Sequence, residues 1–161
     1  MRRVVDTNVP IVANGIGTNA SIDCRLAAVE FLNILIEKGK TILDFGGEIQ
    51  SEYRNYLNPN GQPGVGDRFY QMILSSAPAR VERIELPKDA VTGDFIDFPN
   101  DPALAAFDRS DRKFAAAARK TGLSVANATD SDWAIHKAAL GKNGIAVDFI
   151  CGCDQTKWFT D

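Results

Sequence analysis

The sequence predicts an α/β fold of three layers, with a central, mainly parallel sheet covered by helices on both faces. Short apolar segments typical of buried strands alternate with longer segments of helical period, which is the pattern of βαβ units. The chain has 161 residues and 45% hydrophobic residues, enough for one domain with its own core. No linker divides it, so we expect a single domain spanning residues 1–161.

The expected strands are short apolar or alternating segments bounded by turn residues. They are 3–5, 41–45, 81–86, 123–126 and 145–151. The expected helices have apolar residues on one face and begin or end at capping residues. They are 21–38, 48–57, 67–75, 103–121, with a bend near Ser110, and 131–140. Ser21 is suited to cap the first helix, and Gly39 and Gly122 to end the first and fourth.

Two stretches between these elements are rich in Gly, Asn and Pro, and we expect loops at 14–20 and 58–66. The segment 87–102 contains three prolines and several aspartates without helical period. It is predicted to be a long, partly extended surface loop, inserted into the domain.

The composition excludes several classes of protein. Eighteen Lys and Arg stand against 21 Asp and Glu, a net charge of −3, so the chain is not a polybasic nucleic-acid wrapper. Its N-terminus lacks the apolar region of a signal peptide, and no apolar run approaches the ~20 residues of a membrane span. Its three cysteines have no regular spacing, so we expect reduced thiols and a cytoplasmic protein. These cysteines are Cys24, Cys151 and Cys153.

Acidic residues recur at or just after the carboxyl ends of the expected strands, where open parallel sheets bind ligands. They are Asp6, the pair Glu48 and Glu52, the pair Asp108 and Asp111, and the pair Asp130 and Asp132. Each pair on a helix is expected to share a face. Any one of these acids could instead cap a helix or face solvent, but four such positions in order favour a shared site.

Clustered carboxylates repel one another unless a cation lies among them. Mg²⁺ and Mn²⁺ prefer oxygen ligands, and His136 is the only histidine, so a His/Cys zinc site lacks ligands. The pattern therefore predicts Mg²⁺- or Mn²⁺-dependent phosphodiester chemistry, in which the ion activates water and polarises the phosphate.

The sequence resembles the PIN-domain ribonucleases, which include the toxins of bacterial toxin–antitoxin pairs. Four segments carry the resemblance in order along nearly the whole chain. They are VVDTN at 4–8, SEYRNYL at 51–57, SDRKFAAAARKTG at 110–122 and NATDSDW at 127–133. The chain is longer than typical toxins of the family, mainly between Asn8 and Ser21 and in the segment 87–102.

The resemblance implies an endoribonuclease selective for single-stranded RNA, often a homodimer and often neutralised by an antitoxin peptide. The residues it assigns to catalysis and metal binding are Asp6, Glu52, Asp111 and Asp130, with Asp132 as a fifth metal ligand. Glu48 competes with Glu52, and Asp108 with Asp111. The family context of each motif favours Glu52 and Asp111.

Substrate contacts are predicted at small polar and basic residues next to the acids, because phosphates supply much of the affinity for nucleic acids. They are Thr7, Asn8, Arg54 and Arg112, with Arg109 and Lys113 nearby. Surface salt bridges are the alternative role for the basic residues. Trp133 is expected in the core and His136 on the surface.

Setting the five proposed metal ligands aside from the 21 acids leaves 16 acidic against 18 basic residues. The net charge therefore does not argue against an RNA substrate.

Two other functions are considered. A PIN-like fold without catalysis could bind RNA or a protein partner through the 87–102 loop. A receiver-like domain would need an acidic pair near the first strand and a later strand-end lysine, and the sequence shows neither clearly.

Overall fold

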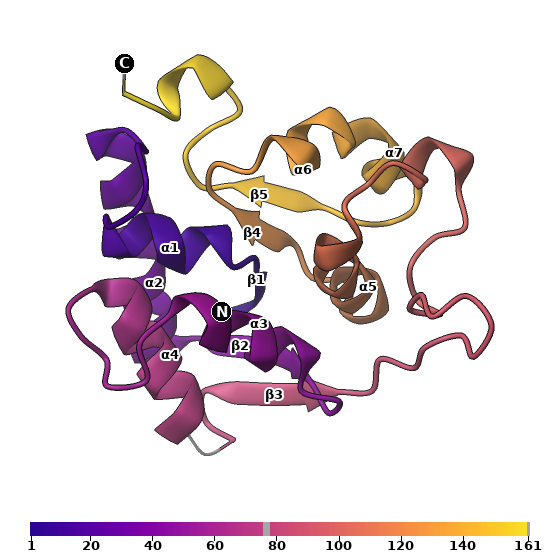
Figure 1. Ribbon diagram of the computed structural model, residues 1–161, viewed down its shortest axis with the longest axis horizontal. Coiled ribbons are helices and arrows are strands. Elements are labelled where there is room, and N and C mark those ends of the chain that lie inside the picture. Colours follow the sequence, from indigo (N-terminus) through magenta and orange to yellow (C-terminus); the bar gives the residue numbers. More distant parts are fainter. Residues whose placement is uncertain (76–77, 161) are drawn as a thin grey trace.

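The computed structural model describes residues 1–75 and 78–160, and a parallel five-stranded sheet forms the centre of this part of the chain (Figure 1). The strand order is β3-β2-β1-β4-β5, and each neighbouring pair is parallel. The strands are β1 (Arg2–Val5), β2 (Lys40–Asp44), β3 (Val81–Ile84), β4 (Val125–Asn127) and β5 (Val147–Phe149). The predicted three-layer α/β/α architecture is confirmed.

Helices pack on both faces of this sheet. On one side α1 (Asn8–Asn14), α2 (Ile22–Lys38) and α4 (Val65–Ser75) contact one another. On the other, α5 (Arg112–Thr121) contacts β1, β2 and β4, and α3 (Glu48–Tyr56) contacts β2 and α5. The short α6 (Ser131–Ile135) and α7 (Lys137–Lys142) lie beside β5 in Figure 1, and α7 contacts the 3₁₀ turn Pro102–Leu104.

The chain order places a switch point between β1 and β4. From β1 the chain continues outward through β2 and β3, then returns to the other side of β1 for β4 and β5. The connections after β1 and β4 therefore leave in opposite directions, which opens a crevice at the carboxyl ends of these two strands. Asp6 follows β1 directly, and Asp130 follows β4 after the turn at Ala128 and Thr129.

The centre of the sheet is apolar on both faces. Val4 and Val5 of β1 are fully buried, as are the four alanines Ala115–Ala118 of α5. Small side chains at these positions let α5 lie close to the sheet. At the end of α5, Gly122 has a φ of 69°, a conformation that glycine adopts without a steric cost.

Two predicted helices are shorter than expected. Residues 103–121 form two 3₁₀ turns, Pro102–Leu104 and Arg109–Asp111, before α5 begins. The Asp108 carboxylate accepts a hydrogen bond from the Ser110 N–H, which caps the second turn, so Asp108 and Asp111 do not share a helix face. Residues 131–140 are divided at His136 into α6 and α7.

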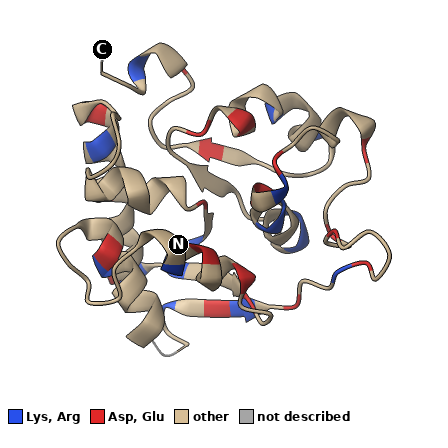
Figure 2. Cartoon of the chain, in the orientation of Figure 1, with Lys and Arg blue, Asp and Glu red and all other residues tan. Residues whose placement is uncertain are grey.

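The segment 87–102 is a loop, as predicted, but it turns back on itself through an antiparallel bridge between Lys88 and Phe95, and only its final residue, Pro102, enters a helical turn. It is not wholly a surface loop, because Phe95 and Phe98 are buried in the core. Across the domain, acidic and basic residues are interspersed along the elements (Figure 2). Within the described residues, no helix has both the length and the apolar character needed to cross a membrane.

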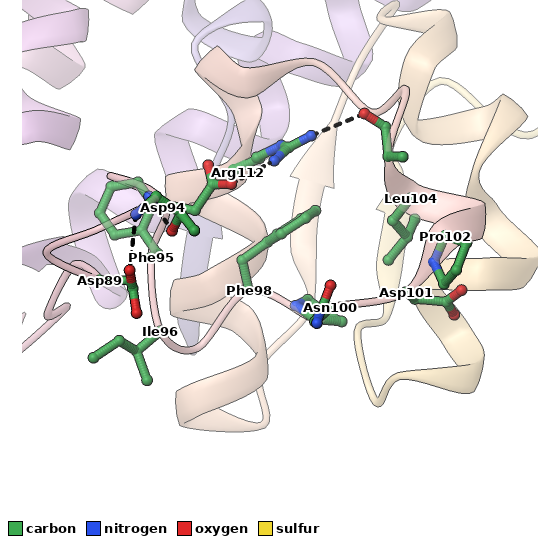
Figure 3. Close-up of a pocket in the computed structure, with 13 residues that line it drawn as sticks. Asp89, Asp94, Phe95, Ile96, Phe98, Asn100, Asp101, Pro102, Leu104 and Arg112 are labelled. Carbon is green, nitrogen blue, oxygen red and sulfur yellow. Dashed lines mark hydrogen bonds and ion pairs between the residues drawn. The ribbon is translucent and has the colours of Figure 1, made fainter.

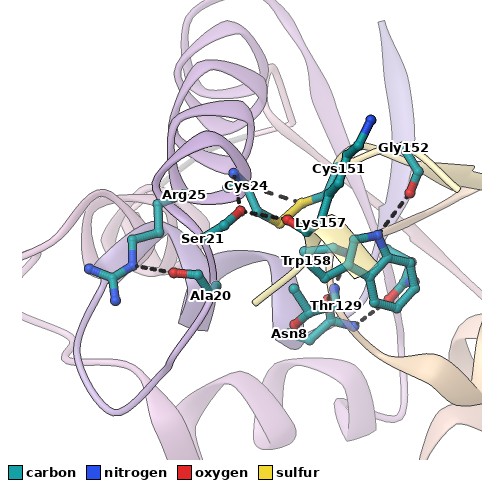
Figure 4. Close-up of a disulfide and its surroundings, with 12 residues drawn as sticks. Asn8, Ala20, Ser21, Cys24, Arg25, Thr129, Cys151, Gly152, Lys157 and Trp158 are labelled. Carbon is teal, nitrogen blue, oxygen red and sulfur yellow. Dashed lines mark hydrogen bonds between the residues drawn. A yellow bond between two sulfur atoms is a disulfide. The ribbon is translucent and has the colours of Figure 1, made fainter. Parts of the chain in front are cut away.

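The expectation of three reduced thiols is wrong for two of the cysteines. Cys24 on α2 and Cys151 after β5 form a disulfide, with Cα atoms 4.9 Å apart (Figure 4). They are 127 residues apart in sequence, so the chain order gave no sign of the pairing. Cys153 is exposed and free. The disulfide and the buried Trp158 hold the C-terminal segment beside the start of α2.

Thiol titration tests this pairing. In protein purified without reductant and unfolded in guanidinium, we expect one reactive thiol per chain, because Cys24 and Cys151 are oxidised. After reduction, the same assay should find all three cysteines. A count of three before reduction would contradict the disulfide, and Cys153→Ser should lower the first count to zero.

Candidate metal centre

Three aspartates meet at the switch point of the sheet. Asp6 follows β1, Asp111 immediately precedes α5, and Asp130 follows β4 and caps α6. One carboxylate oxygen from each residue lies within 4.8 Å of the others, so one ion could contact all three. Asp6 and Asp111 are 3% and 5% exposed, and Asp130 is half-buried. The fold thus brings together three of the four predicted catalytic residues.

Asp6 is held by two donors. The indole Nε1–H of Trp133, which is fully buried on α6, donates to one carboxylate oxygen, and the Asn8 backbone N–H donates to the other. Trp133 was correctly expected in the core, but its hydrogen bond to Asp6 was not predicted. Trp133 and Asp6 are 127 residues apart, and no sequence pattern links two residues at that distance.

Asn8 fixes the turn that carries Asp130. Its side-chain oxygen accepts hydrogen bonds from the backbone N–H groups of Ala128 and Thr129, at 2.7 and 3.2 Å, and its amide donates to Asn127. Figure 4 shows Asn8 next to Thr129. Asn127 in turn accepts from the Asp130 N–H and donates to its carbonyl oxygen. Asn8, predicted to bind substrate, is therefore occupied in joining β1 and β4 across the site.

The three carboxyl groups resist ionisation where they lie. Burial, followed by the charge of Asp130, raises the pKa of Asp6 to about 7. Burial, followed by the charges of Asp6 and Asp130, raises the pKa of Asp111 to about 9. Burial also raises the pKa of Asp130. Among the ion pairs of residues 1–75 and 78–160, none includes these three acids, so a divalent cation would supply the missing positive charge.

Glu52 lies beside this group but outside it. Its Oε1 accepts a hydrogen bond of 2.9 Å from the Thr7 hydroxyl, and its Oε2 is ion-paired with Lys113. Its charge helps to raise the pKa of Asp6, which places the two acids near each other. Glu48, the competing candidate, is ion-paired with Lys88 at the surface. The structure therefore brings Glu52, and not Glu48, to the site.

Asp132 and Asp108 contact each other, and neither belongs to the group of three aspartates. The Asp132 carboxylate accepts from the Asp108 backbone N–H at 2.8 Å and lies 3.1 Å from Nδ1 of His136. Asp111 joins the cluster, whereas Asp108 caps its own turn. His136 is not a surface residue as expected, because it packs half-buried against the ring of Phe107.

The basic residues predicted to contact substrate lie in different surroundings. Arg112 is buried, donates to the carbonyl oxygens of Ala105 and Phe107, pairs with Asp94 and stacks on Phe98. It fastens the 87–102 segment to α5 and is not directed at the acids. Thr7, also buried, is committed to Glu52, while Arg54 on α3 is exposed.

A separate cavity of about 520 Å³ lies under the 87–102 segment (Figure 3). Its lining includes Phe95, Phe98, Leu104 and Arg112. None of the clustered acids lines it. Among the charged residues that do, Arg112 pairs with Asp94, and the carboxylates of Asp89 and Asp101 accept hydrogen bonds from backbone N–H groups of their own turns. The group of acids that could hold a metal ion therefore lies outside this cavity.

Comparisons with known proteins identify no relative. A scan against protein-family models, a search of curated proteins and a search of solved structures each gave no match. Function is therefore inferred from the residues of the site and from the motifs in the sequence.

The raised pKa values predict how stability depends on pH. In EDTA, the unfolding temperature should fall as the pH rises from about 5 to 9, because folded Asp6 and Asp111 retain protons that an unfolded chain loses near pH 4. Differential scanning fluorimetry measures this slope. Asp111→Asn, which mimics the protonated acid, should flatten it and raise the unfolding temperature at pH 8 by roughly 3 °C or more.

Asp23→Asn is the matched control, because Asp23 is exposed on α2. It should leave the slope unchanged. A stability that rises across this pH range, or an equal slope in Asp111→Asn and wild type, would contradict the assignment of buried, protonated acids.

Proposed function

We propose that this chain is a PIN-like, Mg²⁺- or Mn²⁺-dependent endoribonuclease that cleaves single-stranded RNA. The observation that carries the proposal is the convergence of three largely buried carboxylates at the switch point of a parallel sheet, with no basic partner among the described residues. In this proposal Asp6, Asp111 and Asp130 hold the ion, and Glu52 is the fourth acid of the site.

The donor set fits such an ion. All three groups offer oxygen, which Mg²⁺ and Mn²⁺ prefer, and three carboxylates leave positions for water and a substrate phosphate. When bound, the ion supplies Lewis-acid activation of the phosphate and of the attacking water. A structural salt-bridge network would instead place Lys or Arg between the acids.

The protein's own residues prepare the site. Trp133 and Asn8 hold Asp6 and the turn before Asp130 in place, so little reorganisation is needed on binding. Asp111 keeps its proton at neutral pH without a cation, because its pKa is raised to about 9. Binding of the ion should therefore release protons and tighten as the pH rises.

The RNA substrate and the biological setting rest on the resemblance to PIN-domain ribonucleases. The resemblance supports pairing into a homodimer and, for a toxin, neutralisation by an antitoxin protein. The cytoplasmic location expected from reduced thiols loses its support, because Cys24 and Cys151 form a disulfide. Arg54 is the exposed basic residue on α3 available for a substrate phosphate, two residues after Glu52. The alternative is a PIN-like module that binds RNA or a protein without cleaving it.

Cleavage of an end-labelled single-stranded RNA tests the proposal. With Mn²⁺ we expect cutting by wild type, none in EDTA, and a loss of at least about 100-fold in Asp111→Asn and Asp130→Asn, because each removes a charged ligand. Glu48→Gln is the matched control and should cut normally, since Glu48 pairs with Lys88 outside the cluster.

Manganese binding, measured by calorimetry, separates the alternatives. Binding without cleavage of RNA would redirect the proposal to another phosphodiester. Neither binding nor cleavage by folded wild type would overturn the nuclease and favour the binding module. Equal cleavage by wild type and Asp111→Asn would also overturn it.

A further inference from the structure

We propose that Lys113 is a positioning residue that keeps Glu52 out of the metal shell, so that the centre binds its ion through three carboxylates and not four. The inference rests on the proposed function and specifies the ligand set of that site. Its basis is the geometry of one buried ion pair, between Lys113 on α5 and Glu52 on α3.

Both oxygens of Glu52 have partners other than the three clustered aspartates. Lys113 holds Oε2, and the Thr7 hydroxyl holds Oε1 at 2.9 Å. The Lys113 ammonium also donates to the Ser110 carbonyl oxygen, in the turn that carries Asp111. One lysine thus ties Glu52 to the same turn that supplies a ligand, while leaving Glu52 outside the set of mutually close oxygens.

The pair is sheltered from water. The side chains of Lys113 and Glu52 are 11% and 17% exposed, so their attraction is weakly screened. On the same helix, Lys120 pairs with Asp97 at 3.6 Å, with side chains 35% and 28% exposed. Removing one partner of a buried pair leaves the other charge uncompensated. For Glu52, that free charge would lie next to Asp6.

Removing Lys113 is expected to change how strongly the site attracts a cation. Without Lys113, the crevice would contain a fourth carboxylate with a free oxygen, and cations would be attracted more strongly. With Lys113, the pair is neutral, and Glu52 adds little repulsion against an approaching phosphate. Lys113 therefore limits the affinity for the ion and keeps the site compatible with an anionic substrate.

Calorimetric titration with MnCl₂ tests this, using wild type, Lys113→Met, Glu52→Gln and the double variant. Lys113→Met should bind Mn²⁺ at least about tenfold more tightly or take up a second equivalent, the size of change that one nearby charge makes in a proton affinity. Glu52→Gln should bind Mn²⁺ no more tightly than wild type, because it leaves the Lys113 charge uncompensated beside the acids. In the double variant the gain should disappear, because Lys113 acts through Glu52.

Lys120→Met is the matched control and should bind as wild type does, and Lys113→Arg should preserve the pair. Circular dichroism checks folding, and Lys113→Gln replaces Lys113→Met if the latter does not fold. RNA cleavage by Lys113→Met should fall while its Mn²⁺ affinity rises, a split that a purely structural pair would not produce.

Each outcome decides the inference. Equal Mn²⁺ binding by Lys113→Met and wild type would overturn it while leaving the nuclease intact. A gain that persists in the double variant would overturn the route through Glu52. Binding by Lys113→Met alone would support the role of Lys113 but overturn the metal site of the wild type. If neither wild type nor Lys113→Met binds Mn²⁺, both this inference and the proposed metal-dependent nuclease are overturned.

Discussion

The burial of three carboxyl groups next to one another, at the carboxyl ends of β1 and β4, is the constraint on which the other features depend. Asp6, Asp111 and Asp130 come from three distant parts of the chain, and each has a raised pKa with burial as its largest cause. Such a group opposes folding as the pH rises, unless a cation compensates it. Natural chains tolerate this cost mainly where a site needs it.

The surrounding structure keeps these acids from moving apart. The indole of Trp133 and the amide of Asn8 each join segments separated by more than a hundred residues. The alanines of α5 let the helix pack closely on the sheet, with Asp111 at its start. Rigid elements, and not loops alone, therefore set the geometry of the cluster.

The basic residues near the site divide into distinct roles. Arg112 is turned inward and fastens the 87–102 segment, whereas Lys113, the next residue, pairs with Glu52 at the edge of the cluster. The net charge of −3 thus says little about substrate. What matters is that the cluster has no basic partner among the described residues, while its neighbour Glu52 does.

The sequence by itself determined the fold class, the order of the strands and helices, and the carboxylate positions, because hydrophobic period, capping residues and strand-end acids are local patterns. It left Glu48 and Glu52, and Asp108 and Asp111, open. Tertiary structure decided between them, because Glu48 pairs with Lys88 and Asp108 caps its own turn, whereas Glu52 and Asp111 lie at the site. It alone decided the disulfide, the break at His136 and the inward turn of Arg112, because these depend on contacts between residues that are distant in sequence or on packing against another element.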